Sequence, residues 1–207
     1  MKKNIILGII VLICYIFIVT GLNYGIYSDI NIYMQNPTLA NYIGSELPDK
    51  IYEQFKVIRP FIVVGQILFS IIGVLGACAL LYVAAILFLK DKLHFSDLLQ
   101  ACLISEFICI FHAGLNLLGM YTGFLHDGIQ SVGSPLLLMQ AQKLDIWLIT
   151  VFNSMNMFWF AYIVVLILSV TYTCKITYKQ SINIVLCSYG FVSMLMIVFT
   201  CLFMMLQ

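Results

Sequence analysis

Glu106, His112 and Asn116 lie inside one long apolar segment, residues 97–122, and are the side chains of this sequence best suited to chemistry. A carboxyl group beside an imidazole can respond to protons or cations, because each side chain can alter the charge of the other. A charge in the hydrocarbon core of a membrane costs several kcal/mol, so such residues face protein or trapped water. We therefore treat these three residues as the first candidates for a functional site.

Helical periodicity places these side chains on one face. At about 100° per residue, six polar or small side chains of the segment fall within an arc of about 120°; they are Cys102, Ser105, Glu106, Cys109, His112 and Asn116. The rest of the circumference is mostly apolar. This pattern predicts a helix with one face toward partner helices and the other toward lipid.

Two interpretations of this polar face remain open. In the first, it is a structural cluster satisfied across helix contacts, by Asn153, Ser154 or Asn156 of a later apolar segment or by Ser70 of an earlier one. In the second, Glu106 and His112 line a small aqueous cavity, which would make the protein a transporter or channel. The predicted intramembrane cluster consists of Ser105, Glu106, His112, Asn116, Asn153 and Asn156.

The sequence offers little support for catalysis or for a metal site. It contains no H-E-x-x-H, G-x-S-x-G or phosphate-binding G-x-x-x-x-G-K motif. The other two histidines, His94 and His126, fall in connectors predicted to lie on opposite sides of a membrane. The seven cysteines include no C-x-x-C pair and are typical of small buried side chains. We expect no enzyme, no metal and no cofactor.

Composition indicates the elements that must position the polar face. Of the 207 residues, 63% are hydrophobic and 9% are charged, whereas a globular domain has about 25% charged residues. We predict a single all-α membrane domain over 1–207, a five-helix transmembrane bundle. The spans are expected at about 4–22, 61–89, 97–122, 147–173 and 181–206. Residues 23–59 form the longest exposed loop, with an interfacial helix at about 48–59. If the first span were a cleaved signal peptide, four spans would remain.

The distribution of lysine predicts the orientation. The N-terminus and the connectors after the second and fourth spans share one side, and they contain Lys2, Lys3, Lys90, Lys92, Lys175 and Lys179. Basic residues in short loops mark the cytoplasmic side, so the N-terminus is predicted to be cytoplasmic. Ten Lys plus Arg against nine Asp plus Glu give no sign of a nucleic-acid partner. The expected partners are the lipid bilayer and either other proteins or a second copy of the chain.

The predicted second span carries a face of small residues. Gly65, Gly73, Gly76, Ala77 and Ala84 fall within about 120°, and Gly73 and Ala77 form a small-x-x-x-small pair. Such a face lets two helix backbones approach closely. We expect Gly73, Gly76 and Ala77 to pack within the bundle, with a homodimer contact as the alternative.

Three stretches of sequence together resemble a known family. They are LFLKDKLHFSDLLQACLISEF, FNSMNMFWFAYIVVLILSVTYTCKITYKQSINIVL and SELPDKIYEQFKVIRPF. The first resembles a span that leads through a basic turn into the next, and the second resembles a late pair of spans joined by a Lys-Ile-x-x-Lys turn. This pattern, over about 40–207, is similar to the Yip family of five-span Ypt/Rab-interacting membrane proteins and their prokaryotic relatives.

The resemblance implies a non-enzymatic integral membrane protein, and it offers no catalytic residues to transfer. Eukaryotic members carry a long cytoplasmic region before their spans, whereas the first span is expected here at about 4–22. We therefore expect a prokaryotic-type member in a bacterial plasma membrane, with the Golgi or endoplasmic-reticulum membrane as the alternative. The expected function is that of a membrane scaffold or partner-binding protein, and the alternative is the small transporter or channel.

Overall fold

The computed structural model describes Ile10, Ile13 and residues 48–89, 93–122, 132–138 and 144–205. These residues form helices and their connections, and no strand occurs among them, which confirms the all-helical prediction. Most of the predicted first span at 4–22 and the loop at 23–47 lie outside the described residues.

Four helical segments of the described chain are long and apolar enough to cross a membrane. They are Ile67–Phe88, Phe95–Asn116, Trp147–Cys174 and Tyr178–Phe203, with 22 to 28 residues each. A helix needs about 20 residues to cross the hydrocarbon core. The chain is therefore a multi-pass membrane protein by the length and composition of its helices.

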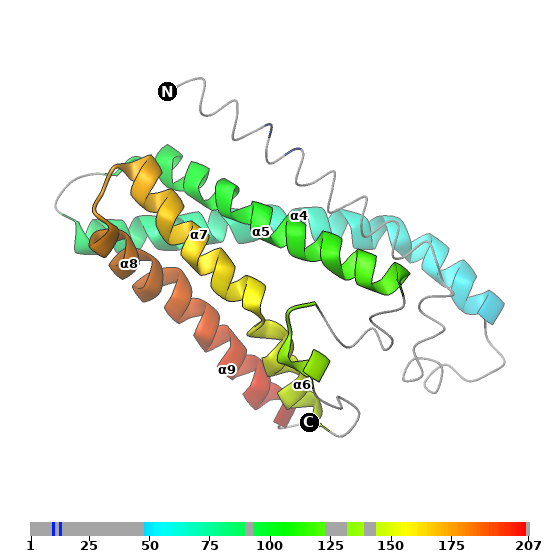
Figure 1. Cartoon of the computed structure of the whole chain (residues 1–207). Helices are drawn as coiled ribbons and strands as arrows, with labels where there is room; N and C mark the ends of the chain where they lie inside the picture. The colour runs from blue at the N-terminus through cyan, green and yellow to red at the C-terminus, as the bar shows by residue number, and fades with distance from the viewer. Residues whose placement is uncertain are drawn as a thin grey trace.

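Helix α4, Pro48–Phe88, is one continuous helix of 41 residues that includes Pro60. The sequence had predicted an interfacial helix at 48–59 followed by a separate span. Proline removes one backbone hydrogen bond and disfavours a helix interior, but long helices of membrane proteins accommodate it. The two predicted elements are thus a single rod, and its Pro48 end extends past the other helices (Figure 1).

Helix α5, Phe95–Tyr121, matches the predicted span at 97–122 within two residues. Asp97 lies in its first turn, where a negative charge complements the positive end of the helix dipole. A 3-10 turn, η1, follows at Pro135–Leu138.

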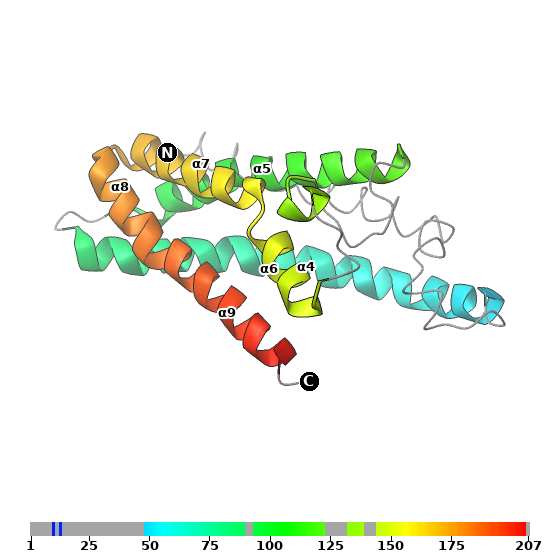
Figure 2. The ribbon, with the colours of Figure 1, turned by 60° about the horizontal axis from the view of Figure 1, so that its bottom comes forward.

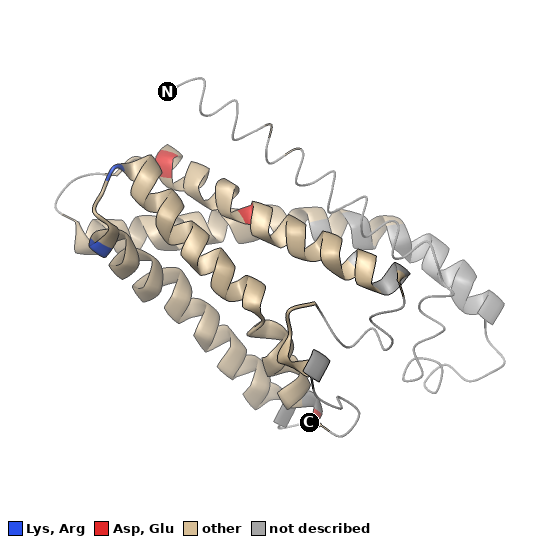
Figure 3. Ribbon diagram, viewed as in Figure 1, with Lys and Arg blue, Asp and Glu red and all other residues tan. Residues whose placement is uncertain are grey.

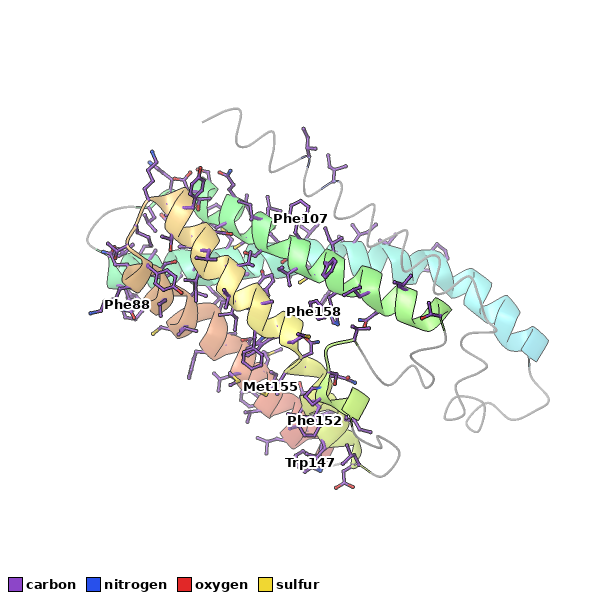
Figure 4. All side chains as sticks on the ribbon, in the orientation of Figure 1. Phe88, Phe107, Trp147, Phe152, Met155 and Phe158 are labelled. Carbon is purple, nitrogen blue, oxygen red and sulfur yellow. The ribbon has the colours of Figure 1, made fainter. Side chains whose placement is uncertain are left out.

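The span predicted at 147–173 is not continuous but consists of two helices, α6 at Ile146–Ser154 and α7 at Met157–Cys174. Between them Asn156 adopts an extended conformation with φ −79° and ψ 167°. Asparagine competes with helical hydrogen bonds and favours caps, which explains why the helix stops and restarts here. Figure 4 shows the labelled side chains of Met155 and Phe158 on either side of the break.

The last span contains three helical pieces. Helix α8, Tyr178–Val185, begins with a capping box between Thr177 and Gln180. It continues through a π-helical turn, η3 at Leu186–Gly190, into α9 at Phe191–Met205. The predicted span at 181–206 therefore exists, but with a π-helical turn inside it.

The buried core lies where α4, α5, α7 and α8 meet, and its most enclosed side chains include Cys78, Leu81, Leu98, Leu166 and Ile184. Helix α5 packs along α7, and α6 packs on α9. Figure 2 shows α9 diverging from α4 toward the C-terminus. Large apolar side chains such as Phe69, Leu87 and Phe199 are exposed on the outside, as expected of a surface that faces lipid.

Candidate functional site

Glu106 and Tyr162 form a buried hydrogen bond between α5 and α7. The Tyr162 hydroxyl donates to Oε1 of Glu106 at 3.0 Å, and the two side chains are only 4% and 9% exposed, respectively. An unsatisfied polar group in this environment would cost several kcal/mol, so each side chain stabilises the burial of the other. Figure 3 shows that the acidic positions of α5 lie among uncharged residues.

Tyr162 was not among the residues that the sequence singled out. Its hydroxyl was the available signal, because a buried tyrosine usually finds a hydrogen-bond partner. Its ring also lies against that of Tyr189, with the ring centroids 5.3 Å apart. Tyr189 belongs to the π-helical turn η3, so three spans meet around the Glu106–Tyr162 pair.

His112 and Asn116 form a second polar group, one turn apart on α5. Asn116 Nδ2 lies 3.1 Å from His112 Nε2, and Asn116 Oδ1 accepts a hydrogen bond from the Val132 amide at 2.6 Å. The second bond fixes the amide orientation, so Nδ2 donates and Nε2 accepts, which places the proton of a neutral imidazole on Nδ1. The His112 ring also stacks on Phe158 of α7, with centroids 4.6 Å apart.

The loop at 132–134 fills the break between α6 and α7. The Gly133 carbonyl accepts a hydrogen bond from the Met157 amide at 3.1 Å, and the Ser134 hydroxyl donates to the Phe152 carbonyl at 3.1 Å. Non-helical backbone at membrane depth is tolerated where protein surrounds it and satisfies its polar groups. Residues 132–134, which lie outside the span, provide these hydrogen-bond partners for the backbone at the break.

Gly133 is the residue that makes this close approach possible. Its φ is +81°, and a Cβ added there would lie 2.6 Å from Met157 Cγ and 2.9 Å from Phe158 Cε2. Residues with a side chain rarely adopt this left-handed backbone conformation, and Met157 and Phe158 already fill the space that a Cβ would need. A glycine is therefore required for the loop to dock.

The Asn156 side chain bridges the break between α6 and α7. Asn156 Oδ1 accepts a hydrogen bond from the Trp159 amide at 2.9 Å, and Asn156 Nδ2 donates one to the Asn153 carbonyl at 2.9 Å. The side chain thus caps α7 and also binds the end of α6. The contacts of Asn156 differ from the predicted cross-helix role of satisfying Glu106 or His112.

The predicted cluster is therefore divided among several local groups. Glu106 pairs with Tyr162, His112 and Asn116 bind the loop, and Asn156 caps α7. Ser105 is fully buried and donates to the Ala101 carbonyl of its own helix at 2.9 Å. We call the groups at the contacts between α5, the loop and the α6–α7 segment the polar seam, defined as Glu106, His112, Asn116, residues 132–134, Asn156 and Tyr162.

The small residues of α4 do not behave uniformly. Ala77 is buried in the core, as predicted for a packing face. Gly73 and Gly76 are exposed, and a Cβ added at either would have no neighbour within 4 Å. They do not pack on another described helix, because the buried face of α4 runs through Val74, Ala77, Cys78 and Leu81 instead.

Within the described part of the chain, no group of three or more His, Cys, Asp or Glu residues is placed to hold a metal ion. The comparisons with known proteins add no further constraint: no family model, curated protein or solved structure matches the chain. The likeness to the Yip family therefore rests on the three sequence stretches alone.

Proposed function

We propose that the chain is a non-enzymatic integral membrane protein that acts as a scaffold or binds partner proteins. The observation that carries this proposal is the pairing within the polar seam. Tyr162 donates to Glu106, and Asn116 contacts both His112 and the Val132 amide. Polar groups that satisfy one another between helices hold a bundle together.

The finer features of this proposal come from the sequence. They are five spans, a cytoplasmic N-terminus, a bacterial plasma membrane and membership of the Yip family. The lysines of the short connectors support the orientation. The protein partners, or a second copy of the chain, would bind from within the membrane or at its surface.

One observation favours a second candidate, a small transporter or channel that uses Glu106 and His112. The span at Trp147–Cys174 is broken at Met155 and Asn156, and broken helices often form substrate sites in transporters. Here the loop at 132–134 occupies the break and forms hydrogen bonds with the backbone on both sides of it. This supports a structural role for the break, so we rank the transporter or channel second.

Reconstitution into liposomes separates the two candidates. For a scaffold, we expect no flux of protons, cations or small solutes above empty vesicles, from mildly acidic to mildly alkaline pH. We also expect Glu106→Met to lower the melting temperature in detergent and Glu106→Gln, which keeps an acceptor for Tyr162, to restore most of it. A specific flux that Glu106→Gln abolishes without changing the melting temperature would instead establish the transporter.

A further inference from the structure

A pocket lies away from the polar seam, where α5 begins and α7 ends. Its volume is about 760 Å³, and its lining includes Asp97 and Gln100 of α5 and Leu168, Thr171, Tyr172 and Lys175 at the end of α7. This size falls within the range of small-molecule sites, roughly 300 to 1,000 Å³. Figure 3 shows that charged residues of both signs occur at this end of the bundle.

The pocket contains one charge of each sign. Asp97 is in the first turn of α5, and Lys175 follows the last residue of α7 in a left-handed conformation with φ 54°. Among the described residues, no ion pair joins these two side chains, and the Ser96 hydroxyl donates a hydrogen bond to Oδ1 of Asp97 at 3.4 Å. A carboxylate accepts several hydrogen bonds, so Asp97 can bind a ligand cation beside this contact. Gln100 and Thr171 add polar groups between them. A ligand that neutralises both ends must itself be zwitterionic.

The wall of the pocket continues onto the apolar surface of α7. Leu168 and Tyr172, one turn apart, are 52% and 85% exposed, and Val164, one turn earlier, is also exposed. Candidate spans begin at Phe95 and end at Cys174, so the pocket lies at the depth of lipid headgroups. The apolar stripe below it lies where acyl chains run.

We propose that this pocket binds the headgroup of a zwitterionic phospholipid that carries a primary amine. The ammonium group bonds Asp97 and Gln100, the phosphate bonds Lys175, and an acyl chain follows Tyr172 and Leu168. A primary ammonium has three hydrogen-bond donors, whereas a trimethylated amine has none to offer a carboxylate. An anionic headgroup without an amine would leave Asp97 facing a phosphate.

Binding of defined lipids to the purified full chain tests this site. Short-chain phosphatidylethanolamine, phosphatidylcholine and phosphatidylglycerol are titrated in detergent, and dissociation constants are measured by the fluorescence of the native tryptophans or by mass spectrometry of the intact complex. We expect the ethanolamine lipid to bind about tenfold more tightly than either other lipid. Asp97→Asn should remove this preference, and Asp97→Glu should retain it.

Matched controls use exposed charges outside the pocket. Lys175→Met should weaken binding of both zwitterionic lipids, whereas Lys179→Met and Asp145→Asn, at exposed positions on α8 and before α6, should change neither. Equal affinity for all three lipids, or an ethanolamine preference that survives Asp97→Asn, would overturn the proposal. Binding of chain-free phosphoethanolamine as tightly as the lipid would overturn the assignment to a membrane lipid.

Discussion

The Tyr162 hydroxyl shows how one atom can decide the role of a buried acid. Tyr162 gives Glu106 a partner from another helix, which favours a helix contact over a hydrated cavity at this position of α5. With the hydroxyl 3.0 Å away, the carboxyl group is part of a helix contact. Interhelical hydrogen bonds in membranes contribute about 0.6 kcal/mol each on average, so the contact gives specificity of packing more than a large gain in stability.

Gly133 provides a test of loop docking at the residue scale. We expect Gly133→Ala to destabilise the protein by about 1–3 kcal/mol, because it forces a side chain into a left-handed conformation against Met157 and Phe158. The melting temperature in detergent should fall. Gly76→Ala is the matched control, since open space surrounds that position, and it should cause no loss. An equal fall for both variants would contradict the docking of Gly133.

Asn116 tests the link between α5 and the loop. Asn116→Leu removes the acceptor of the Val132 amide, so hydrogen exchange at Val132 should become faster. Exchange near Leu98, which is fully buried at the other end of α5, should stay unchanged. Protection of Val132 that persists in this variant would show that another group holds the loop in place.

At the scale of elements, the break between α6 and α7 depends on the cap at Asn156. Asn156→Ala should cost about 0.5–2 kcal/mol of unfolding free energy, because the Trp159 amide loses its acceptor. Asn156→Ser keeps a capping oxygen and should recover most of this loss. Chemical denaturation in mixed micelles measures both variants. Equal stability of the alanine and serine variants would show that the side-chain cap contributes nothing.

The sequence predicted the helices better than their interruptions. The apolar run at 97–122 predicted α5 within two residues, because a long apolar segment leaves a helix as the simplest way to satisfy its backbone. Asparagine inside a span can either form a hydrogen bond to another helix or cap a helix. The sequence predicts the first role for Asn156, and the structure shows the second. Pro60 falls between the interfacial helix predicted at 48–59 and the span predicted at 61–89, yet α4 continues through it.

The partners within the polar seam could be predicted only in part. The face that carries Glu106, His112 and Asn116 followed from helical periodicity. Which residue meets Glu106 depends on how α7 rotates against α5, and Ser70, Asn153, Ser154 and Asn156 were equally plausible before that rotation was known. Residues 132–134 contact α5 and the break between α6 and α7, which are distant from them in the sequence. Local sequence patterns carry no information about contacts between distant segments.

At the scale of the whole molecule, the number of spans determines where the termini lie. Five spans with a cytoplasmic N-terminus put the C-terminus on the opposite side of the membrane. In one fusion, a reporter that is active only in the cytoplasm is attached to the N-terminus, and we expect it to be active. In a separate fusion, a reporter that is active only after export is attached to the C-terminus, and we expect it to be active too. Activity of a cytoplasmic reporter at both termini would contradict five spans.

The pairing of Glu106 with Tyr162 across the bundle is the contact on which the scaffold proposal depends most. A double-mutant cycle measures it directly, with the unfolding free energies of Glu106→Met, Tyr162→Phe and the double variant compared with those of the original chain. Each single change leaves a buried polar partner behind, whereas the double change removes both partners. We expect the double variant to cost less than the sum of the single variants by about 0.5–2 kcal/mol. Costs that add within about 0.3 kcal/mol would show that this pair does not hold α5 and α7 together.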